Sequence, residues 1–567
     1  MGSNNIWTPR TSSGEVADSY EFKRINSLPR RSEWANYVEE LTETFKRPEG
    51  TERLRPVQAA ALAELHECRG LFGAMRVGAG KTLVTYLAPC VMEAKRPLLL
   101  IPKKLEGETQ EKFRHLSKHW YGPTYYRIES YELVSRSSGS DLLDRYRPDL
   151  IVMDESHKLK STRSALTKRI KRYVEANPET VIVALTGTIT KRSIKDYAHL
   201  LKWCLRDRSP VPARWDELDL WAAVLDEDPT LLGIDFGAFT QWCENPVPTR
   251  YDVREAYKRR LIETPGVIAT QSEDVAATLS VHPMVGPTCP RIDAAFQTLH
   301  GSWELPDGTM LEDGFRVWAA ARELGLGFFY KWDPEPPAEW VVRRKLWASY
   351  CRQILKNNRR QLDSAEDVAN AIDRGWYEDG GVLSGWREIR GTFEPNSKAV
   401  WISDEPLKAI VQWIKDNSPA IIWVQHVEFA RELSRRTGLV YYHKQGESDS
   451  GRKILHHPPN TSLIASLKSN QEGRNLQAWS RNLVLAPPTT GYEWEQLLGR
   501  THREGQLAQE VTYTYYLGCA AHLDAVLQAR RDAVYRQQTT SSDDKLLTSD
   551  FVEPILPTIG AQWREKS

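Results

Sequence analysis

The sequence predicts an α/β protein with two parallel-sheet lobes and a large, mainly helical insertion between them. Short apolar runs followed by helix-favouring stretches recur in two blocks of the chain, and this alternation is typical of βαβ units. The range between the blocks is rich in charged and helix-favouring residues and has only weak strand signals. A chain of 567 residues is long enough for several domains of roughly 150 residues each.

The first block, residues 51–205, contains four candidates for buried strands. They are the run that leads into Gly73 and the segments 98–101, 150–153 and 181–185. The second block, residues 396–533, contains five more, at 420–424, 440–442, 463–466, 483–486 and 511–517. Apolar runs this short are typical of strands that helices cover on both faces, so each block is expected to form one lobe.

Residues 206–395 are expected to form the helical insertion. A turn is predicted inside it, because Pro334, Pro336 and Pro337 exclude a helix interior. Residues 1–50 and 534–567 are polar, or rich in Ser, Thr and Asp, and are expected to be extensions of the lobes.

Composition restricts the function classes. Lys and Arg number 76 and Asp and Glu 75, so any nucleic-acid surface must be a local patch rather than a global excess of charge. The seven cysteines lie far apart, which disfavours a zinc knuckle or a disulfide framework and favours a reducing compartment. The apolar runs are far shorter than the roughly twenty residues of a membrane span. A cytoplasmic protein is expected.

A glycine loop follows the first apolar run. Gly78, Ala79, Gly80, Lys81 and Thr82 stand between this run and a helix-favouring stretch. Backbone N–H groups of such a loop surround phosphate oxygens, Lys81 is expected to contact the β and γ phosphates of ATP, and the Thr82 hydroxyl is expected to bind Mg²⁺. The alternative is a glycine-rich turn before an ordinary helix.

Two adjacent carboxylates end the strand at 150–153. Open α/β sheets place their ligands at such strand ends, so Asp154 is expected to hold Mg²⁺ and Glu155 to orient or deprotonate the water that attacks the γ-phosphate. An Asp-Glu pair alone is more often a solvated loop or a helix cap. The glycine loop upstream in the same block favours the catalytic interpretation.

Two arginines in the second block complete the predicted site. Arg500 and Arg503 are three residues apart, so they would share one face if the segment is helical. From a facing lobe they would neutralise charge on the γ-phosphate as arginine fingers. A surface helix with ordinary ion pairs is the alternative.

These segments resemble the superfamily-two nucleic-acid helicases and, within them, the Snf-type DNA translocases. The resemblance covers residues 51–205 and 396–533. Residues 154–157 are similar to the DExH box, and 496–506 fit the pattern QxxGRxxRxGQ at every fixed position. The sequence GRTHREGQ at residues 499–506 is most similar to that of bacterial and bacteriophage members of the family. A phage-encoded protein would be expected in the host cytoplasm.

The resemblance implies two RecA-like lobes that bind ATP and Mg²⁺ in the cleft between them. It also implies that Arg55 and Gln58 sense the adenine and that Gln496 contacts the nucleotide. The residues that it implies for coupling hydrolysis to movement are His157, Thr186 and Thr188.

A basic strip follows the DExH box. Its seven cations are Lys158, Lys160, Arg163, Lys168, Arg169, Lys171 and Arg172, with no acid among them. The strip is either a phosphate-binding surface or a solvated helical face. Ser130 and Ser466 are further nucleic-acid candidates by resemblance. A second basic strip from Arg343 to Arg360 is interleaved with tryptophans, for which core packing is favoured over base stacking.

The predicted function is an ATP-dependent motor on double-stranded DNA, contacted mainly through its backbone, with a role in replication, recombination or repair and with a possible protein partner for the insertion. One alternative is a strand-separating DNA or RNA helicase with a wedge at 328–332. Another is an ATP-gated nucleic-acid clamp that does not move. His115 and His119 lie at helical spacing, but no third metal ligand is evident near them in the sequence.

Overall fold

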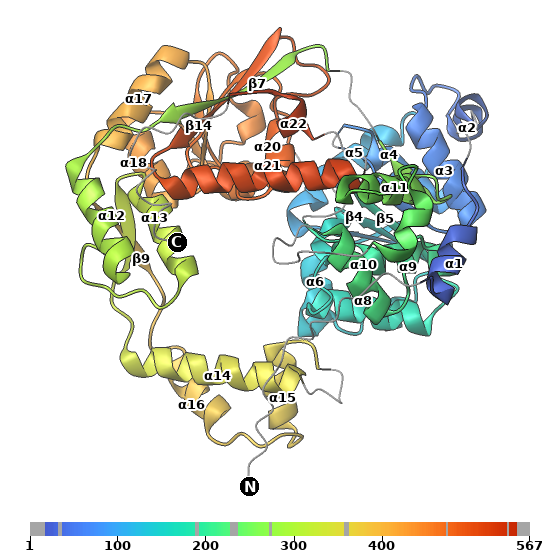
Figure 1. Ribbon diagram of the computed structural model, residues 1–567, viewed down its shortest axis with the longest axis horizontal. Helices are drawn as coiled ribbons and strands as arrows, with labels where there is room; N and C mark the ends of the chain where they lie inside the picture. The colour runs from blue at the N-terminus through green and yellow to red at the C-terminus, as the bar shows by residue number, and fades with distance from the viewer. Residues whose placement is uncertain are drawn as a thin grey trace.

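Two parallel sheets form the framework of the chain. The computed structural model describes residues 18–31, 37–76, 78–187, 192–226, 236–270, 275–356, 362–471, 474–540 and 544–552. Figure 1 shows the first lobe on the right, the second lobe at the upper left and a helical arm below them. The fold class predicted from the sequence is confirmed, because both sheets are parallel and helices cover both faces of each.

The first sheet has six strands in the order β3-β2-β4-β5-β1-β6. Their bounds are β1 Leu71–Ala74, β2 Pro97–Ile101, β3 Arg127–Ser130, β4 Leu150–Asp154, β5 Val181–Thr186 and β6 Val267–Ala269. One face is covered by α2 (Val38–Phe45), α3 (Pro56–Cys68), α4 (Lys81–Val91) and α5 (Glu106–Leu116). The other face is covered mainly by α8 (Ala165–Ala176), α9 (Ala198–Leu205), α10 (Trp215–Leu225) and α11 (Arg250–Ile262). Burial on both faces explains why the central strands are almost wholly apolar.

The second sheet has seven strands in the order β11-β12-β10-β13-β14-β7-β15. Their bounds are β7 Thr278–Val285, β10 Ile421–Val424, β11 Tyr441–Tyr442, β12 Leu463–Ser466, β13 Arg481–Val484, β14 Glu510–Leu517 and β15 Asp550–Phe551. The helices α17 (Glu405–Asn417) and α18 (Val427–Thr437) pack on one face. The helices α20 (Gly491–Leu498), α21 (Ala520–Thr540) and α22 (Lys545–Thr548) pack on the other.

The predicted insertion at 206–395 is corrected, because it is not one separate unit. Strand β6 pairs with β1 in the first sheet, and β7 pairs with β14 over its whole length in the second. The predicted extension at 534–567 also supplies β15, which pairs with β7. Pro283 disguised β7 in the sequence. It is tolerated there because β15 pairs only with Ser280 and Val281, so the strand has one neighbour at Pro283.

The N-terminal range 1–50 is also part of the first lobe where it is described. Helix α1 (Tyr20–Ser27) inserts Phe22 against Trp221 and stacks it on Trp242, with ring centroids 6.1 and 4.8 Å apart. Helix α2 packs on α3. No helix within the described ranges is long and apolar enough to cross a bilayer.

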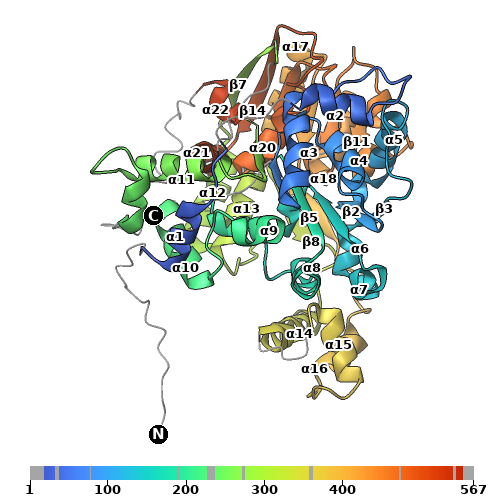
Figure 2. The same cartoon turned by 90° about the vertical axis from the view of Figure 1, so that its right-hand side faces the viewer.

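A helical arm extends from the second lobe and contacts the first. We define the arm as α14 (Ala338–Lys356), α15 (Ala365–Asp373) and α16 (Val382–Ile389). It is attached through an antiparallel pair, β8 (Phe328–Trp332) and β9 (Ser397–Trp401). Figures 1 and 2 show it apart from both sheets, beside α8 of the first lobe.

Ion pairs fasten the arm to the first lobe. Arg169 on α8 donates to Asp367 at 2.8 Å, and Arg172 donates to Asp363 at 2.6 and 3.0 Å. The side chains of Arg169 and Asp363 are only 3% and 2% exposed. Two of the seven cations in the first basic strip are therefore neutralised by the arm, so the strip is a less positive surface than its sequence indicates.

Helix α21 makes a second link between the lobes. Its first half packs on α20 and β14, and its second half reaches α11 of the first lobe (Figure 1). Tyr535 donates its hydroxyl hydrogen to Asp226 at 2.8 Å, and Arg254 donates to Gln538 at 2.7 Å. The two lobes are thus joined both through α21 and through the arm.

Candidate functional site

The glycine loop connects β1 to α4 at the carboxyl edge of the first sheet. Gly78 and Gly80 have φ values of +95° and +80°, which L side chains rarely adopt. A Cβ atom at position 80 would also lie 1.9 Å from Gln58 Nε2, so only glycine fits. Lys81 is the first residue of α4 and donates through Nζ to the carbonyls of Met75 (2.7 Å) and Arg76 (3.0 Å). The ammonium group therefore lies inside the loop.

The first turn of α3 is fastened to this loop. Gln58 Nε2 donates to the carbonyl of Gly80 at 3.2 Å, and Arg55 Nη1 donates to the carbonyl of Gly78 at 3.0 Å. Gln58 Oε1 accepts the backbone N–H of Arg55 at 2.8 Å, so one of the backbone N–H groups left unpaired at the start of α3 is satisfied. Arg55 also forms a 2.7 Å ion pair with Glu504 of the second lobe.

Asp154 and Glu155 lie together at the end of β4, which is a central strand. Burial and the neighbouring Glu155 charge raise the pKa of Asp154, whereas Lys81 opposes the increase. Burial also acts to raise the pKa of Glu155, but His157, Lys81 and Arg500 outweigh it and hold that pKa below its usual value. The pair therefore keeps one carboxylate firmly ionised in a site that contains cations from both lobes.

His157 connects Glu155 and the end of β5 to the second lobe. Its Nδ1 lies 3.3 Å from Glu155 Oε2 and 3.5 Å from Thr186 Oγ1 at the end of β5. Its Nε2 lies 2.7 Å from the hydroxyl of Tyr492 on α20, and the two rings are in contact, with centroids 4.6 Å apart. The predicted coupling residues His157 and Thr186 are thus brought together, while Thr188 lies outside the described residues.

The two arginines follow α20 rather than lie on it. The helix ends at Leu498, because Gly499 is followed by turns, so the predicted common helical face does not exist. Arg500 is instead held by hydrogen bonds to the carbonyls of Gln496 (2.8 Å) and Arg474 (2.9 Å). Arg503 donates to Asn475 Oδ1. These contacts aim both guanidinium groups at the first lobe.

One cavity of about 860 Å³ collects most of the predicted site. Its lining includes Arg55, Gln58, Gly78, Gly80, Lys81, Thr82, Asp154, Glu155, Asn475, Arg500 and Arg503. The hydroxyl of Thr82 and the carboxylate of Asp154 are hard oxygen ligands of the kind that Mg²⁺ prefers, so these residues fit the metal. Groups from both lobes therefore face one space that phosphate groups would occupy.

Two predicted nucleotide contacts lie outside this lining. Gln496 is 1% exposed, and its Oε1 accepts a hydrogen bond from Arg500 at 3.2 Å, so it positions that arginine instead. Ala79 is buried as part of the loop. Sequence reasoning missed Tyr492, which belongs to no recognisable motif. It also missed Asn475, although the segment Arg474-Asn475-Leu476 resembles a GxNL segment of the helicase family.

The nucleic-acid candidates are dispersed. Lys158 and Arg163 are exposed and Lys160 is half-buried beyond the end of β4. Ser130 is buried and caps the helix at Tyr131–Ser135, where its hydroxyl accepts the N–H of Leu133 at 3.2 Å. Ser466 is half-buried at the end of β12, and its hydroxyl donates to Ser469 at 3.4 Å. Ser130 is therefore occupied by a structural role that the sequence did not indicate.

The aromatic segments act mainly in packing. Phe328 and Phe329 are buried, and Phe328 contacts Phe429 and His426 on α18 and in the turn before it. Trp340 of the second basic strip is buried against Phe393, as the core interpretation predicted. Of the four aromatic rings in the proposed wedge, only Trp332 is substantially exposed. Nothing in this arrangement favours a strand-separating wedge.

Comparison with known proteins agrees with the geometry of the first lobe. Residues 55–197, about a quarter of the chain, match the DEAD/DEAH box helicase family, and the matched range spans the glycine loop and residues 154–157. No curated protein matches the chain. Among solved structures the chain is similar to the Sulfolobus solfataricus SWI2/SNF2 ATPase core in complex with dsDNA, at 16% identity, with 88% of this chain and 95% of that chain covered and a TM-score of 0.29. The matched residues form a helicase-type ATPase domain, so the chain is an enzyme.

Proposed function

We propose that the protein is a nucleic-acid-stimulated ATPase that uses hydrolysis between its two lobes to move on, or remodel, double-stranded DNA. The observation that carries the proposal is the single cavity that joins Lys81, Asp154 and Glu155 of the first lobe to Arg500 and Arg503 of the second. A site divided in this way is complete only when the lobes are close together. Its chemistry therefore depends on lobe position.

The first lobe would bind the triphosphate. Backbone N–H groups of the glycine loop and the start of α4 favour anions, and Lys81 adds a full positive charge inside the loop. Thr82 and Asp154 would hold Mg²⁺, which when bound supplies positive charge to the phosphate oxygens. Arg55 and Gln58 line the same cavity and would face the nucleoside end.

Glu155 and the two arginines would carry the hydrolytic step. Glu155 stays ionised because His157, Lys81 and Arg500 lower its pKa against the effect of burial, so its carboxylate can orient the attacking water. Arg500 and Arg503 would stabilise the charge on the transferred phosphoryl group, an effect worth about 10³ to 10⁵ in rate in related chemistry. Both arginines belong to the second lobe, so they reach the cavity only when that lobe lies against the first.

Hydrolysis would be coupled to movement through the contact between His157 and Tyr492. This contact joins Glu155 to α20 across the cleft, so a change at the γ-phosphate position is felt by the second lobe. Exposed Lys158 and Arg163, directly beyond the DExH box, support a contact with the phosphate backbone of DNA. Duplex DNA and a role in replication, recombination or repair follow from the Snf-type resemblance, as does a bacterial or bacteriophage source.

A cytoplasmic location completes the proposal. It is supported by seven cysteines that are all unpaired.

The test is steady-state ATP hydrolysis by the whole chain, alone and with duplex DNA, single-stranded DNA or RNA, at two salt concentrations. Stimulation by duplex DNA that falls with salt is expected. Stimulation by single strands or RNA alone would contradict the choice of duplex DNA. Lys81→Ala should abolish nucleotide binding, while Lys415→Ala, on the exposed surface of α17, should not.

The arm favours a second candidate, an ATP-gated clamp that grips DNA without moving along it. The arm extends from the second lobe, and its Asp363 and Asp367 form buried ion pairs with Arg169 of the first lobe, which would resist large changes in lobe position. Glu155→Gln separates the two functions. A clamp retains its ATP-dependent grip on DNA when hydrolysis is abolished, whereas a motor loses all displacement along DNA.

A further inference from the structure

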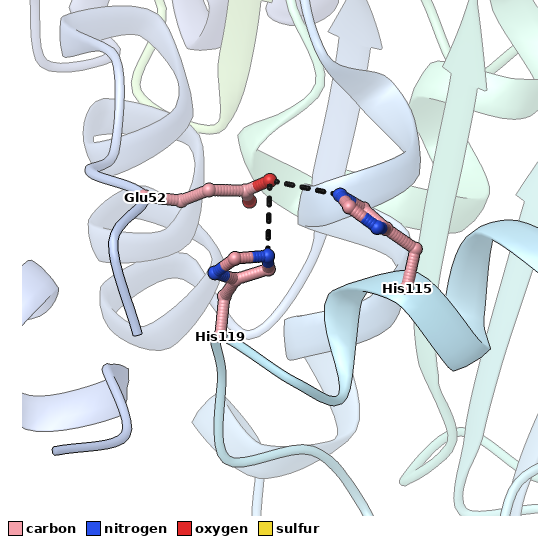
Figure 3. Close-up of side chains that lie close together, drawn as sticks. All are labelled: Glu52, His115 and His119. Carbon is pink, nitrogen blue, oxygen red and sulfur yellow. Dashed lines mark ion pairs between the residues drawn. The ribbon is translucent and has the colours of Figure 1, made fainter. Parts of the chain in front are cut away.

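Three metal-ligating side chains converge beside the nucleotide cavity. Glu52 precedes α3, His115 lies in the last turn of α5, and His119 follows that helix (Figure 3). Both imidazoles direct Nε2 toward the same oxygen, Glu52 Oε1, at 3.3 Å from His115 and 3.9 Å from His119. Within the part of the chain that the structure describes, these ligand atoms all lie within 4.8 Å of one another.

The surroundings of this cluster restrain it. Trp120 Nε1–H donates to Glu52 Oε2 at 2.9 Å, which turns the other oxygen, Oε1, toward the histidines. Thr51 Oγ1 lies 3.4 Å from His119 Nδ1 and can accept the proton that a metal-bound imidazole carries on that nitrogen. Without a metal, the N–H of Thr51 donates to the same Nδ1 at 3.3 Å. Two of the three ligands therefore have a neighbour that sets their orientation.

We propose that Glu52, His115 and His119 bind one divalent transition-metal ion of the Zn²⁺ class. Two imidazoles and one carboxylate form a ligand set that zinc accepts and that Mg²⁺ and Ca²⁺ disfavour. A tetrahedral ion with bonds of about 2.0–2.2 Å separates its ligand atoms by about 3.3–3.6 Å. The 3.3 Å separation lies in this range, and the 3.9 Å separation needs only a small movement of the His119 side chain. Three protein ligands leave the fourth position to water or to another small ligand.

The metal site lies at the edge of the proposed ATP cavity, apart from the residues proposed to bind the phosphates. Glu52 and His115 line the same cavity as Arg55 and Lys81. A bound ion would tie the segment that leads into α3 to the end of α5. The histidine pair was visible in the sequence, but the third ligand was hidden, because Glu52 is remote along the chain and is brought close only by the packing of α3 against the rest of the lobe.

The matching alternative is a metal-free cluster, in which the Nε2–H groups of both histidines point at Glu52 Oε1. Both histidines stand within ion-pair distance of the carboxylate, so this arrangement needs no metal. The two possibilities differ in one measurable respect, which is stoichiometric binding of a transition metal to the folded chain.

The experiment is a calorimetric titration of the chelator-treated whole chain with ZnCl₂ in the absence of nucleotide, repeated with CoCl₂ while the visible absorption of tetrahedral Co²⁺ is followed. The informative variants are His115→Ala and Glu52→Gln. The His115 side chain is 63% exposed, so its removal should not unfold the lobe, and thermal melting checks this point for both variants. His66→Ala, at an exposed position on α3, is the matched control.

One site per chain is expected in the parent protein and in His66→Ala, with at least a tenfold loss of affinity in His115→Ala and Glu52→Gln. Thr51→Ala should weaken binding by about tenfold through loss of the acceptor for His119. Absence of Zn²⁺ binding by the parent chain would overturn the proposal. Equal binding by the parent and by folded His115→Ala and Glu52→Gln would also overturn it, since the ion would then occupy other groups, such as cysteines.

Discussion

Replacing Tyr492 by Phe should weaken the coupling between the lobes while leaving each lobe intact. The Tyr492 hydroxyl lies 2.7 Å from His157 Nε2 and makes the contact from α20 to the DExH box. His157 Nδ1 faces Glu155 Oε2 at 3.3 Å, and Nε2 on the other side of the ring shares the hydrogen bond with the Tyr492 hydroxyl. The Phe side chain keeps the ring contact, whose centroids are 4.6 Å apart, and removes only the hydrogen bond.

The size of the effect follows from this single bond. A hydrogen bond of this kind contributes about 0.5–1.5 kcal/mol net, which corresponds to a decrease of about 2- to 13-fold in the equilibrium constant for lobe closure. If turnover requires closure, kcat/KM for DNA-stimulated ATP hydrolysis falls by the same factor. The free energy of unfolding of the first lobe should not change, because the lost bond lies between lobes.

The assay is steady-state ATP hydrolysis with saturating duplex DNA, measured in parallel for Tyr146→Phe. Tyr146 donates its hydroxyl hydrogen to the carbonyl of Pro97 at 3.1 Å within the first lobe, so this control removes a similar bond without touching the cleft. An unchanged kcat/KM in Tyr492→Phe would refute the coupling role. An equal decrease in Tyr146→Phe would show that the loss is not specific to the contact between lobes.

Three further substitutions test other parts of the structure. Arg503→Ala should leave ATP affinity unchanged and reduce turnover by about 10³-fold. Fluorescence titration with a labelled nucleotide measures the affinity, and the hydrolysis assay measures the turnover. A normal turnover number would remove Arg503 from the site. Burial raises the pKa of Asp226 to about 6, so its contribution to stability is complete below about pH 4 and is lost as the pH rises through 6. Asp226→Asn keeps the Oδ1 atom that accepts the Tyr535 hydrogen bond and removes the charge. Chemical denaturation at pH 8 should therefore show a variant that is more stable by up to about 3 kcal/mol. Equal pH profiles of unfolding free energy for the parent and the variant would contradict this. Arg169→Met breaks a buried ion pair, which typically lowers stability by about 3–5 kcal/mol, so the arm should detach from the first lobe. Faster amide hydrogen exchange in α15 would show this release, and unchanged exchange would contradict it.

Local patterns were sufficient to predict the central strands and the position of the glycine loop. The central strands are buried on both faces, so they appear in the sequence as short, continuous apolar runs with clear ends. The glycine loop was equally evident, because positions 78 and 80 need backbone conformations that other residues rarely adopt. Asp154 and Glu155 were predictable for a related reason, since ligands collect at the carboxyl ends of parallel strands.

Strands and boundaries that depend on distant neighbours were not predictable. Strand β6 has only three residues and β7 contains a proline, so neither matches a strand pattern until the sheet edge that receives it is known. The basic strip beyond the DExH box likewise looked uniformly charged. Its Arg169 and Arg172 are neutralised by Asp363 and Asp367, which follow almost two hundred residues later.

The amino-acid sequence by itself was enough to predict the fold class and to select the glycine loop, the adjacent carboxylates and the two arginines as candidates, because each depends on residue types and spacings within one short segment. Tertiary structure alone decided how these segments meet. It placed Tyr492 against His157, Gln496 behind Arg500, and Glu52 between two histidines. Contacts of this kind join positions far apart in the chain, and their energy comes from the packing of whole lobes, which no local pattern records.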